Sequence, residues 1–180
     1  MKKLITLSVL ALVLAFSACS KKESIQEFYV KNSENPDYLA VDIPMSLFKG
    51  NEASFSAEQQ KAFNSVNKLN VLVYPLKTGQ DTAEFDSQKE EIKEVLSNDD
   101  YEDLVKINNG NQRGVIKVVG DGDAVDEIII YGYDNSKGLA LIRVLGNDMN
   151  PKDFMTLAHS FEKGDLDSSQ FENIAKMFGK

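Results

Sequence analysis

Four short apolar runs separated by turn residues constrain the fold of this chain more than any other feature. They occupy residues 101–107, 114–119, 125–133 and 139–145. The segments between them are rich in Asn, Asp, Gly and Ser, which are the residues that reverse a chain between strands. Connections this short join antiparallel neighbours, because parallel strands need a long crossover. The pattern therefore predicts an antiparallel β-meander.

The loop lengths allow one self-consistent register for these strands. Lys117 lies opposite Leu104 in this register, and Ile129 lies opposite both Lys117 and Arg143. Side chains alternate across a strand, so the register gathers an apolar set on one face: Val105, Ile107, Ile116, Val118, Ile128, Ile130, Ala140, Ile142 and Val144. We expect this face to lie beneath helices that carry Phe154, Leu157, Phe161, Phe171 and Phe178.

The opposite face of the predicted sheet mixes charged, aromatic and aliphatic residues. Glu127 lies diagonally from Lys117 and Arg143, within reach of long side chains, so the charges can neutralise one another. Tyrosine and arginine among aliphatic residues are typical of interface hot spots. The candidate interaction face consists of Lys117, Glu127, Ile129, Tyr131, Tyr133, Leu141 and Arg143. The alternative is that a helix over residues 55–66, a helix over 82–97 or the N-terminal tether covers this face.

Helical periodicity flanks the meander on both sides. It occurs over residues 55–66 and 82–97, after Asn150-Pro151, and over 169–178. A short apolar stretch before the first helix reaches Pro44, which limits a strand there to an edge. These patterns predict an α+β fold, an antiparallel β-meander sheet with helices packed mainly on one face, in a single domain over residues 38–180.

The N-terminus has the layout of a bacterial lipoprotein precursor. Two lysines precede a predominantly apolar run over residues 4–16, and Phe16-Ser17-Ala18-Cys19 resembles a lipobox. The run is shorter than the roughly 20 residues of a membrane-spanning helix. We expect a signal peptide over 1–18, acylation of Cys19, for example with palmitate, and a polar tether over 19–37 that docks in part. The protein would then be held at the outer membrane, facing either the periplasm or the exterior.

Charge and residue usage exclude several classes of function. The net charge is −8, and removal of residues 1–18, with two lysines and no acids, makes it −10. This charge disfavours nucleic acid and anionic head groups as partners. The single histidine, His159, cannot build a His-rich metal site. Asp121 and Asp123 resemble the start of a calcium loop, but the glutamate that an EF-hand needs at its twelfth position falls on Gly132. We expect a hairpin turn there, no metal and no cofactor.

One short motif suggests a covalent modification. Asp81-Thr82-Ala83 matches the O-glycosylation pattern of secreted Bacteroidota proteins. Thr82 is therefore a candidate glycosylation site. The alternative is that Asp81 or Thr82 caps the helix that follows.

The order of elements resembles a known family. A strand and a charged helix precede the meander, which contains Leu104-Val105-Lys106 and ends at Gly146-Asn147-Asp148-Met149. This arrangement is similar to the small lipoproteins of Bacteroidota grouped as domain of unknown function 4252. The resemblance implies a host phylum and a cell-envelope location, and it implies no activity.

Three functions are compatible with these patterns. The first is a non-enzymatic binding or interaction module, whose partners are the membrane, through the lipid at Cys19, and a protein or small envelope component. The second is a regulatory component of an envelope-stress circuit with an extracytoplasmic sigma factor. The third is a hydrolase with an unrecognised site.

Overall fold

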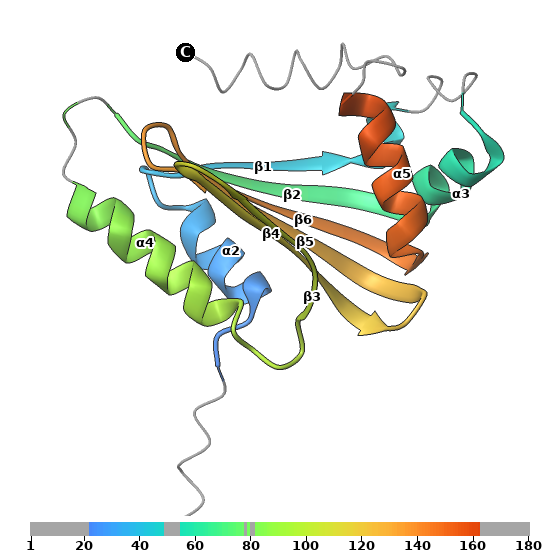
Figure 1. Cartoon of the computed structure of the whole chain (residues 1–180), viewed down its shortest axis with the longest axis horizontal. Coiled ribbons are helices and arrows are strands. Elements are labelled where there is room, and N and C mark those ends of the chain that lie inside the picture. Colours follow the sequence, from blue (N-terminus) through green and yellow to red (C-terminus); the bar gives the residue numbers. More distant parts are fainter. Residues whose placement is uncertain (1–21, 49–54, 78, 80–81, 163–180) are drawn as a thin grey trace, which may run out of the picture.

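A six-stranded antiparallel sheet with helices on both sides forms the structure (Figure 1). This computed structural model describes residues 22–48, 55–77, 79 and 82–162. The strands are β1 Leu39–Pro44, β2 Val66–Pro75, β3 Glu102–Asn109, β4 Gln112–Asp121, β5 Ala124–Asp134 and β6 Gly138–Met149, and the helices are α2 Ile25–Ser33, the 3-10 helix η1 Met45–Phe48, α3 Ala57–Ser65, α4 Thr82–Val95 and α5 Pro151–Glu162. The α+β class is confirmed. The predicted signal peptide, Cys19 and the helix expected over 169–178 lie outside the described residues.

The strands follow the order β1-β2-β6-β5-β4-β3. The last four strands run as the predicted meander, from β3 at one edge to β6 in the middle of the sheet. Strand β6 then pairs with β2, although the two strands are far apart in the sequence. Strand β1 forms the other edge and ends at Pro44, as the proline predicts.

The predicted register is confirmed over most of the meander. Ile129 lies opposite Lys117 on one side and Arg143 on the other. Val105 lies opposite Ile116, which the same register requires. Short turns and alternating burial are therefore enough to fix the pairing of the inner strands.

The predicted pairing of Lys117 with Leu104 is wrong by one residue. Lys117 lies opposite Asp103, because a register shift between Asp103 and Val105 makes Leu104 an extra residue in the edge strand. The shift places the Asp103 carboxylate 2.7 Å from Lys117 Nζ. Bulges of this kind are common at sheet edges, where no second neighbour constrains the strand.

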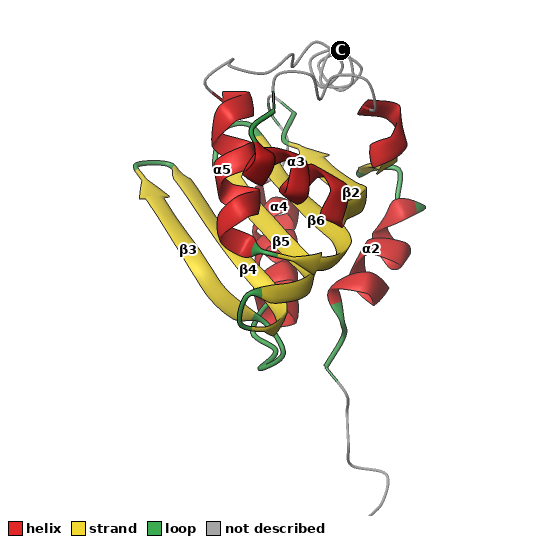
Figure 2. Ribbon diagram, turned by 90° about the vertical axis from the view of Figure 1, so that its right-hand side faces the viewer, coloured by secondary structure: helices red, strands yellow, loops and turns green. Residues whose placement is uncertain are grey.

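Helices α3 and α5 and the 3-10 helix η1 pack on the predicted apolar face. Buried Ile128, Val144 and Leu157 belong to this cluster, and Phe154 is partly buried against it. Asn150 caps α5 as expected, since its side chain accepts hydrogen bonds from the next two available backbone N–H groups. Ile107, expected in this core, is 50 % exposed. Figure 2 shows the reason, since β3 and β4 extend beyond α5.

Helices α2 and α4 pack on the other face of the sheet (Figure 1). Helices expected mainly on one face are therefore divided between the two. Phe28 of α2 and Phe85 of α4 are 0 % and 1 % exposed. They form one cluster with Ile129 and Leu141 of the sheet. The second face is thus a second core.

Strand β6 requires glycine at position 146 for steric reasons. A Cβ atom at Gly146 would lie 2.2 Å from the Ser65 carbonyl oxygen and 2.6 Å from Met149 Sδ. Contacts this short are forbidden by van der Waals repulsion. The glycine therefore lets α3 and the end of β6 pack together, with Met149 0 % exposed.

We predict that Ile128→Asp unfolds the domain. Ile128 is 0 % exposed, so the substitution buries a carboxylate without a partner and costs about 4 kcal/mol or more. Circular dichroism during urea unfolding measures the loss. Ile107→Asp is the matched control on the same face, since the exposed carboxylate stays hydrated. Equal stability of the two variants would contradict this assignment of the core.

Candidate functional site

The middle of the candidate interaction face is covered in the structure. Ile129 and Leu141 are 0 % and 1 % exposed beneath α2 and α4. The helix expected over 82–97 and part of the expected tether therefore provide this cover, which was the alternative open at the level of sequence. The other residues of the face line two hollows, which we name the α2 cleft and the α4 groove.

Helix α2 joins the fold through its own cap and its apolar stripe. Ser24 and Glu27 form a reciprocal capping box, with each side chain bonded to the other residue's backbone N–H. Ile25 and Phe28 are 1 % and 0 % exposed. The tether expected over 19–37 thus docks from Ser24 onward.

A partly buried polar network holds α2 against the edge of the sheet. Tyr29 Oη donates a hydrogen bond of 2.7 Å to Asp42 Oδ1 on β1. Asn70 of β2 donates to the same carboxylate oxygen. Burial is the main cause that raises the pKa of the Tyr29 phenol, and the hydrogen bond to Asp42 is the second. The phenol therefore remains a donor at neutral pH.

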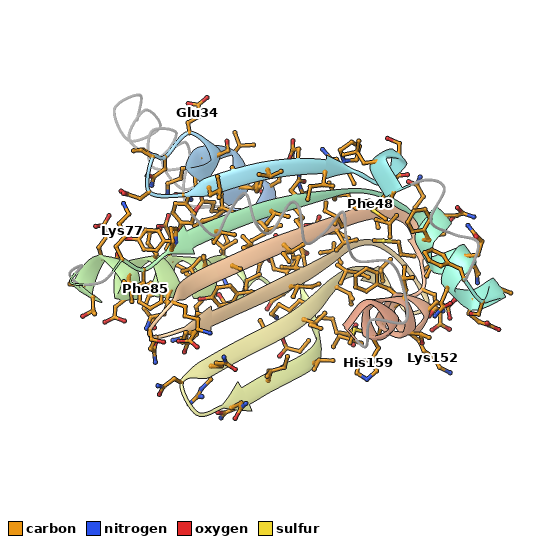
Figure 3. All side chains as sticks on the ribbon, turned by 90° about the horizontal axis from the view of Figure 1, so that it is seen from above. Glu34, Phe48, Lys77, Phe85, Lys152 and His159 are labelled. Carbon is orange, nitrogen blue, oxygen red and sulfur yellow. The ribbon has the colours of Figure 1, made fainter. Side chains whose placement is uncertain are left out.

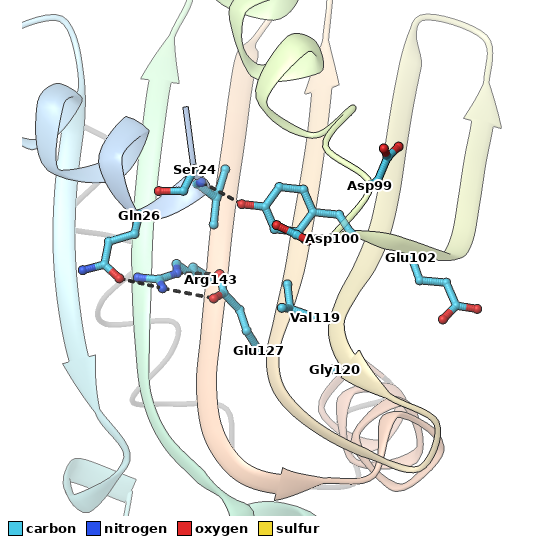
Figure 4. A pocket seen from close by; sticks show the side chains of 11 residues that line it. Ser24, Gln26, Asp99, Asp100, Glu102, Val119, Gly120, Glu127 and Arg143 are labelled. Atoms are coloured by element: carbon cyan, nitrogen blue, oxygen red, sulfur yellow. Dashed lines mark hydrogen bonds and ion pairs between the residues drawn. The ribbon is translucent and has the colours of Figure 1, made fainter. Parts of the chain in front are cut away.

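The α2 cleft is a hollow of about 580 Å³ between the start of α2, the turn before β3 and the face of the sheet. Figure 4 shows Arg143 at its floor, between Gln26 of α2 and Glu127 of β5. Arg143 Nε and Nη2 lie 2.5 and 3.0 Å from the two Glu127 oxygens, and Nη2 lies 3.3 Å from Gln26 Oε1. The predicted neutralisation of Arg143 by Glu127 is therefore confirmed.

The polar groups at the floor of the α2 cleft satisfy one another. The Ile25 backbone N–H donates to Tyr101 Oη at 2.9 Å, and burial raises the pKa of the Tyr101 phenol. The side chains of Glu127 and Arg143 are 12 % and 11 % exposed. Because they form an ion pair away from water, their charges neutralise each other. These contacts attach α2 to the sheet.

The α4 groove is a hollow of about 610 Å³ between α4 and the outer strands of the sheet. Its lining combines lysines, carboxylates and apolar or aromatic side chains: Asp86, Lys89, Glu90, Lys93, Leu96, Ser97, Asp103, Lys106, Val115, Lys117, Tyr131 and Tyr133. Three residues of the candidate interaction face are among them: Lys117, Tyr131 and Tyr133.

Two lysines of the groove are fixed by surrounding groups. Lys89 Nζ lies 4.7 Å from the ring centroid of Phe85 and 5.0 Å from that of Tyr133, at distances that allow cation–π attraction. It also lies 2.6 Å from Asp86 Oδ1. Lys117 Nζ donates to the Tyr101 carbonyl at 3.0 Å. These ammonium groups are positioned before any ligand arrives.

Asp103 is shared between two lysines of the groove. Its oxygens lie 2.6 Å from Lys106 Nζ and 2.7 Å from Lys117 Nζ. The hydrogen bonds from Lys106 and Lys117 hold the pKa of Asp103 below its ordinary value. Four lysines face three carboxylates in this lining. The groove therefore carries an excess positive charge in a protein whose net charge is −8.

Tyr131 provides the unusual group of the groove. It is 7 % exposed, and its buried hydroxyl has no hydrogen-bond partner among the described residues. Burial raises the pKa of the Tyr131 phenol, and electrostatic interaction with Tyr133 and Glu90 raises it further. Tyr131 lines the groove together with both of these neighbours. A buried hydroxyl without a partner costs about 1–3 kcal/mol.

Sequence reasoning missed Asp103, Lys89 and Lys93 as parts of this site. The two lysines lie four residues apart on α4, and this spacing places them on one side of a helix. Nothing local indicates that this side borders the outer strands. Asp103 reaches the groove only because of the bulge in β3.

Other predicted sites lie away from both hollows. His159 is exposed on α5, on the opposite side of the sheet (Figure 3). Thr82 is exposed and begins α4, so glycosylation there stays a prediction. Gly122, with φ of 63°, lies in the tight turn that connects β4 to β5. The predicted hairpin turn is therefore confirmed. Among residues 22–48, 55–77, 79 and 82–162, no cluster of His, Cys, Asp and Glu could hold a metal, and no helix is long and apolar enough to cross a membrane.

We predict that Glu127→Ala destabilises the protein by roughly 3 kcal/mol, because Arg143 is left buried without its partner. The double variant Glu127→Leu with Arg143→Met should return to within about 1 kcal/mol of the wild type, since an apolar pair can replace a buried ion pair. Urea unfolding measures both. Equal loss in the single and double variants would show that the charges themselves are needed.

Comparison with known proteins places the chain in a family. Searches of curated proteins and of solved structures found no match. A family model described as a domain of unknown function, DUF4252, matches residues 26–157. The match begins within α2 and ends within α5, so it includes every strand of the sheet and the whole lining of the α4 groove. The chain therefore belongs to the DUF4252 family.

Proposed function

We propose that this protein is a lipid-anchored cell-envelope protein that binds another molecule without transforming it, and that the α4 groove is its binding site. The observation that carries the proposal is the buried Tyr131 hydroxyl without a partner, in a hollow with excess positive charge. A cost of this kind is retained at sites where a ligand supplies the missing partner.

The N-terminal pattern and the docking of α2 support the proposed anchor. The lipobox-like segment ends at Cys19, and Ser24 caps α2 five residues later. Five residues span at most about 18 Å. Acylation of Cys19 would therefore hold the domain close to the outer membrane, with the start of α2 nearest to the lipid.

Binding fits the groove better than hydrolysis does. Apart from Tyr131 and Tyr133, its titratable side chains are lysines and carboxylates that pair, such as Lys93 with Glu90 at 2.9 Å and Lys89 with Asp86 at 2.6 Å. Such pairs supply charge and hydrogen bonds to a ligand. Covalent catalysis needs a nucleophile activated by a neighbouring base, and the described lining of the groove contains no such pair.

We predict that Cys19→Ala abolishes acylation in the native host. The only thiol of the chain is removed, so no sulfur remains for the lipid and the signal peptide stays uncut. Labelling with an alkyne fatty acid, together with intact mass, measures both effects. Undiminished labelling of the variant would contradict the proposed anchor.

We predict that Lys106→Glu lowers capture of whatever the groove binds in cells. The Lys106 side chain is 74 % exposed, so its replacement changes the charge of the groove and leaves the core intact. Photocrosslinking from Ser97, followed by mass spectrometry, compares the variant with the wild type. Lys152→Glu, on exposed Lys152 of α5 (Figure 3), is the control. Identical adducts in all three proteins, or none in any, would remove the groove as the binding site.

A further inference from the structure

The base of the α4 groove suits an apolar ligand body. Val115, Tyr133 and Leu96 line it, and the ring of Tyr131 packs beside that of Tyr133 at 6.0 Å between centroids. Stems of the lysines extend this apolar surface toward the rim. The volume of about 610 Å³ lies within the range of roughly 300–1,000 Å³ that small-molecule sites occupy.

The rim of the groove suits an anionic head group. Side chains of Lys93 and Lys106 are 72 % and 74 % exposed, and they come from opposite walls, α4 and β3. Asp103 is divided between Lys106 and Lys117. A carboxylate or phosphate placed there would complete the pairing that Asp103 supplies only in part.

Tyr131 lines the groove and carries a buried hydroxyl that can donate a hydrogen bond. Its raised pKa keeps it protonated, so at neutral pH it can donate to an acceptor. A ligand oxygen would supply the partner that the hydroxyl lacks among the described residues. The α2 cleft offers the opposite chemistry, since four carboxylates and one arginine line it and its floor is already paired.

We propose that the α4 groove binds an anionic amphiphile, a small molecule with a carboxylate or phosphate head on an apolar chain. This inference rests on the proposed function and names the ligand of the same site. The apolar chain lies along Val115, Leu96 and the tyrosine rings. The head group lies at Lys106, where the excess positive charge is located.

The test uses the full acylated protein in nanodiscs of phosphatidylcholine. Photoreactive octanoate, octyl phosphate and octanol are the probes, and mass spectrometry maps the labelled peptides. The two anionic probes should label the groove with at least about tenfold higher affinity than octanol, because a charge-assisted hydrogen bond to the head group adds binding free energy of that size. The stronger of these two identifies the source of the head group, a fatty acid or a phosphorylated lipid.

Three variants separate the parts of the proposal. Lys106→Glu should weaken labelling by the anionic probes about tenfold, and Lys152→Glu should leave it unchanged. Tyr131→Phe should weaken labelling several-fold while the midpoint of urea unfolding stays the same or rises, because the unpartnered hydroxyl is removed. A purely structural role for Tyr131 would change the midpoint alone, and that result would overturn its assignment to the ligand.

Two results would overturn the inference as a whole. Equal labelling by octanol and the anionic probes would show that charge plays no part, and full labelling of Lys106→Glu would show that the head group lies elsewhere. Either result leaves the proposed function standing if crosslinking from Ser97 in cells still captures a partner that Lys106→Glu loses. Loss of both would reject the groove as a binding site of any kind.

Discussion

The structure depends on a sheet that is apolar on both faces. Ile128 and Ile129 are adjacent in β5 and point to opposite sides, yet both are 0 % exposed. Burying each such side chain contributes about 1.5–3 kcal/mol, provided that water is excluded from its face. The meander cannot exclude water from its own faces. Helices from both ends of the chain must therefore pack against it, and the segment before β1 and the segment after β6 are both drawn into the fold.

The cover on the α2 and α4 side combines apolar packing with specific polar contacts. Both helices carry narrow apolar stripes, so hydrogen bonds help to define where they lie. Tyr29 bonds to Asp42 and Tyr38 Oη donates to Gln88 Oε1 at 2.6 Å, which tie α2 to β1 and the start of β1 to α4. Buried hydrogen bonds of this kind add little net energy but penalise other arrangements strongly. They select one position for each helix.

The same cover leaves two hollows of opposite character on one face. The α2 cleft is acidic at its rim and internally paired at its floor. The α4 groove is rich in lysines, and it contains a buried hydroxyl without a partner among the described residues. Because of this asymmetry, we interpret the α2 cleft as structural and propose the α4 groove as the binding site. The region matched by the DUF4252 family model contains the whole lining of the α4 groove, so the same question applies to related chains.

Sequence by itself determined the local and periodic features of this protein. Turn residues and alternation fixed the meander and the pairs that Ile129 makes, and Asn150 marked the start of α5. Tertiary structure alone decided the rest: that β6 returns to β2, that helices cover both faces, and that the bulge brings Asp103 to Lys117. The physical reason is range. Periodicity and turn chemistry act between neighbours in the chain, whereas the seating of helices and the pairing of charges depend on which distant surfaces exclude water together.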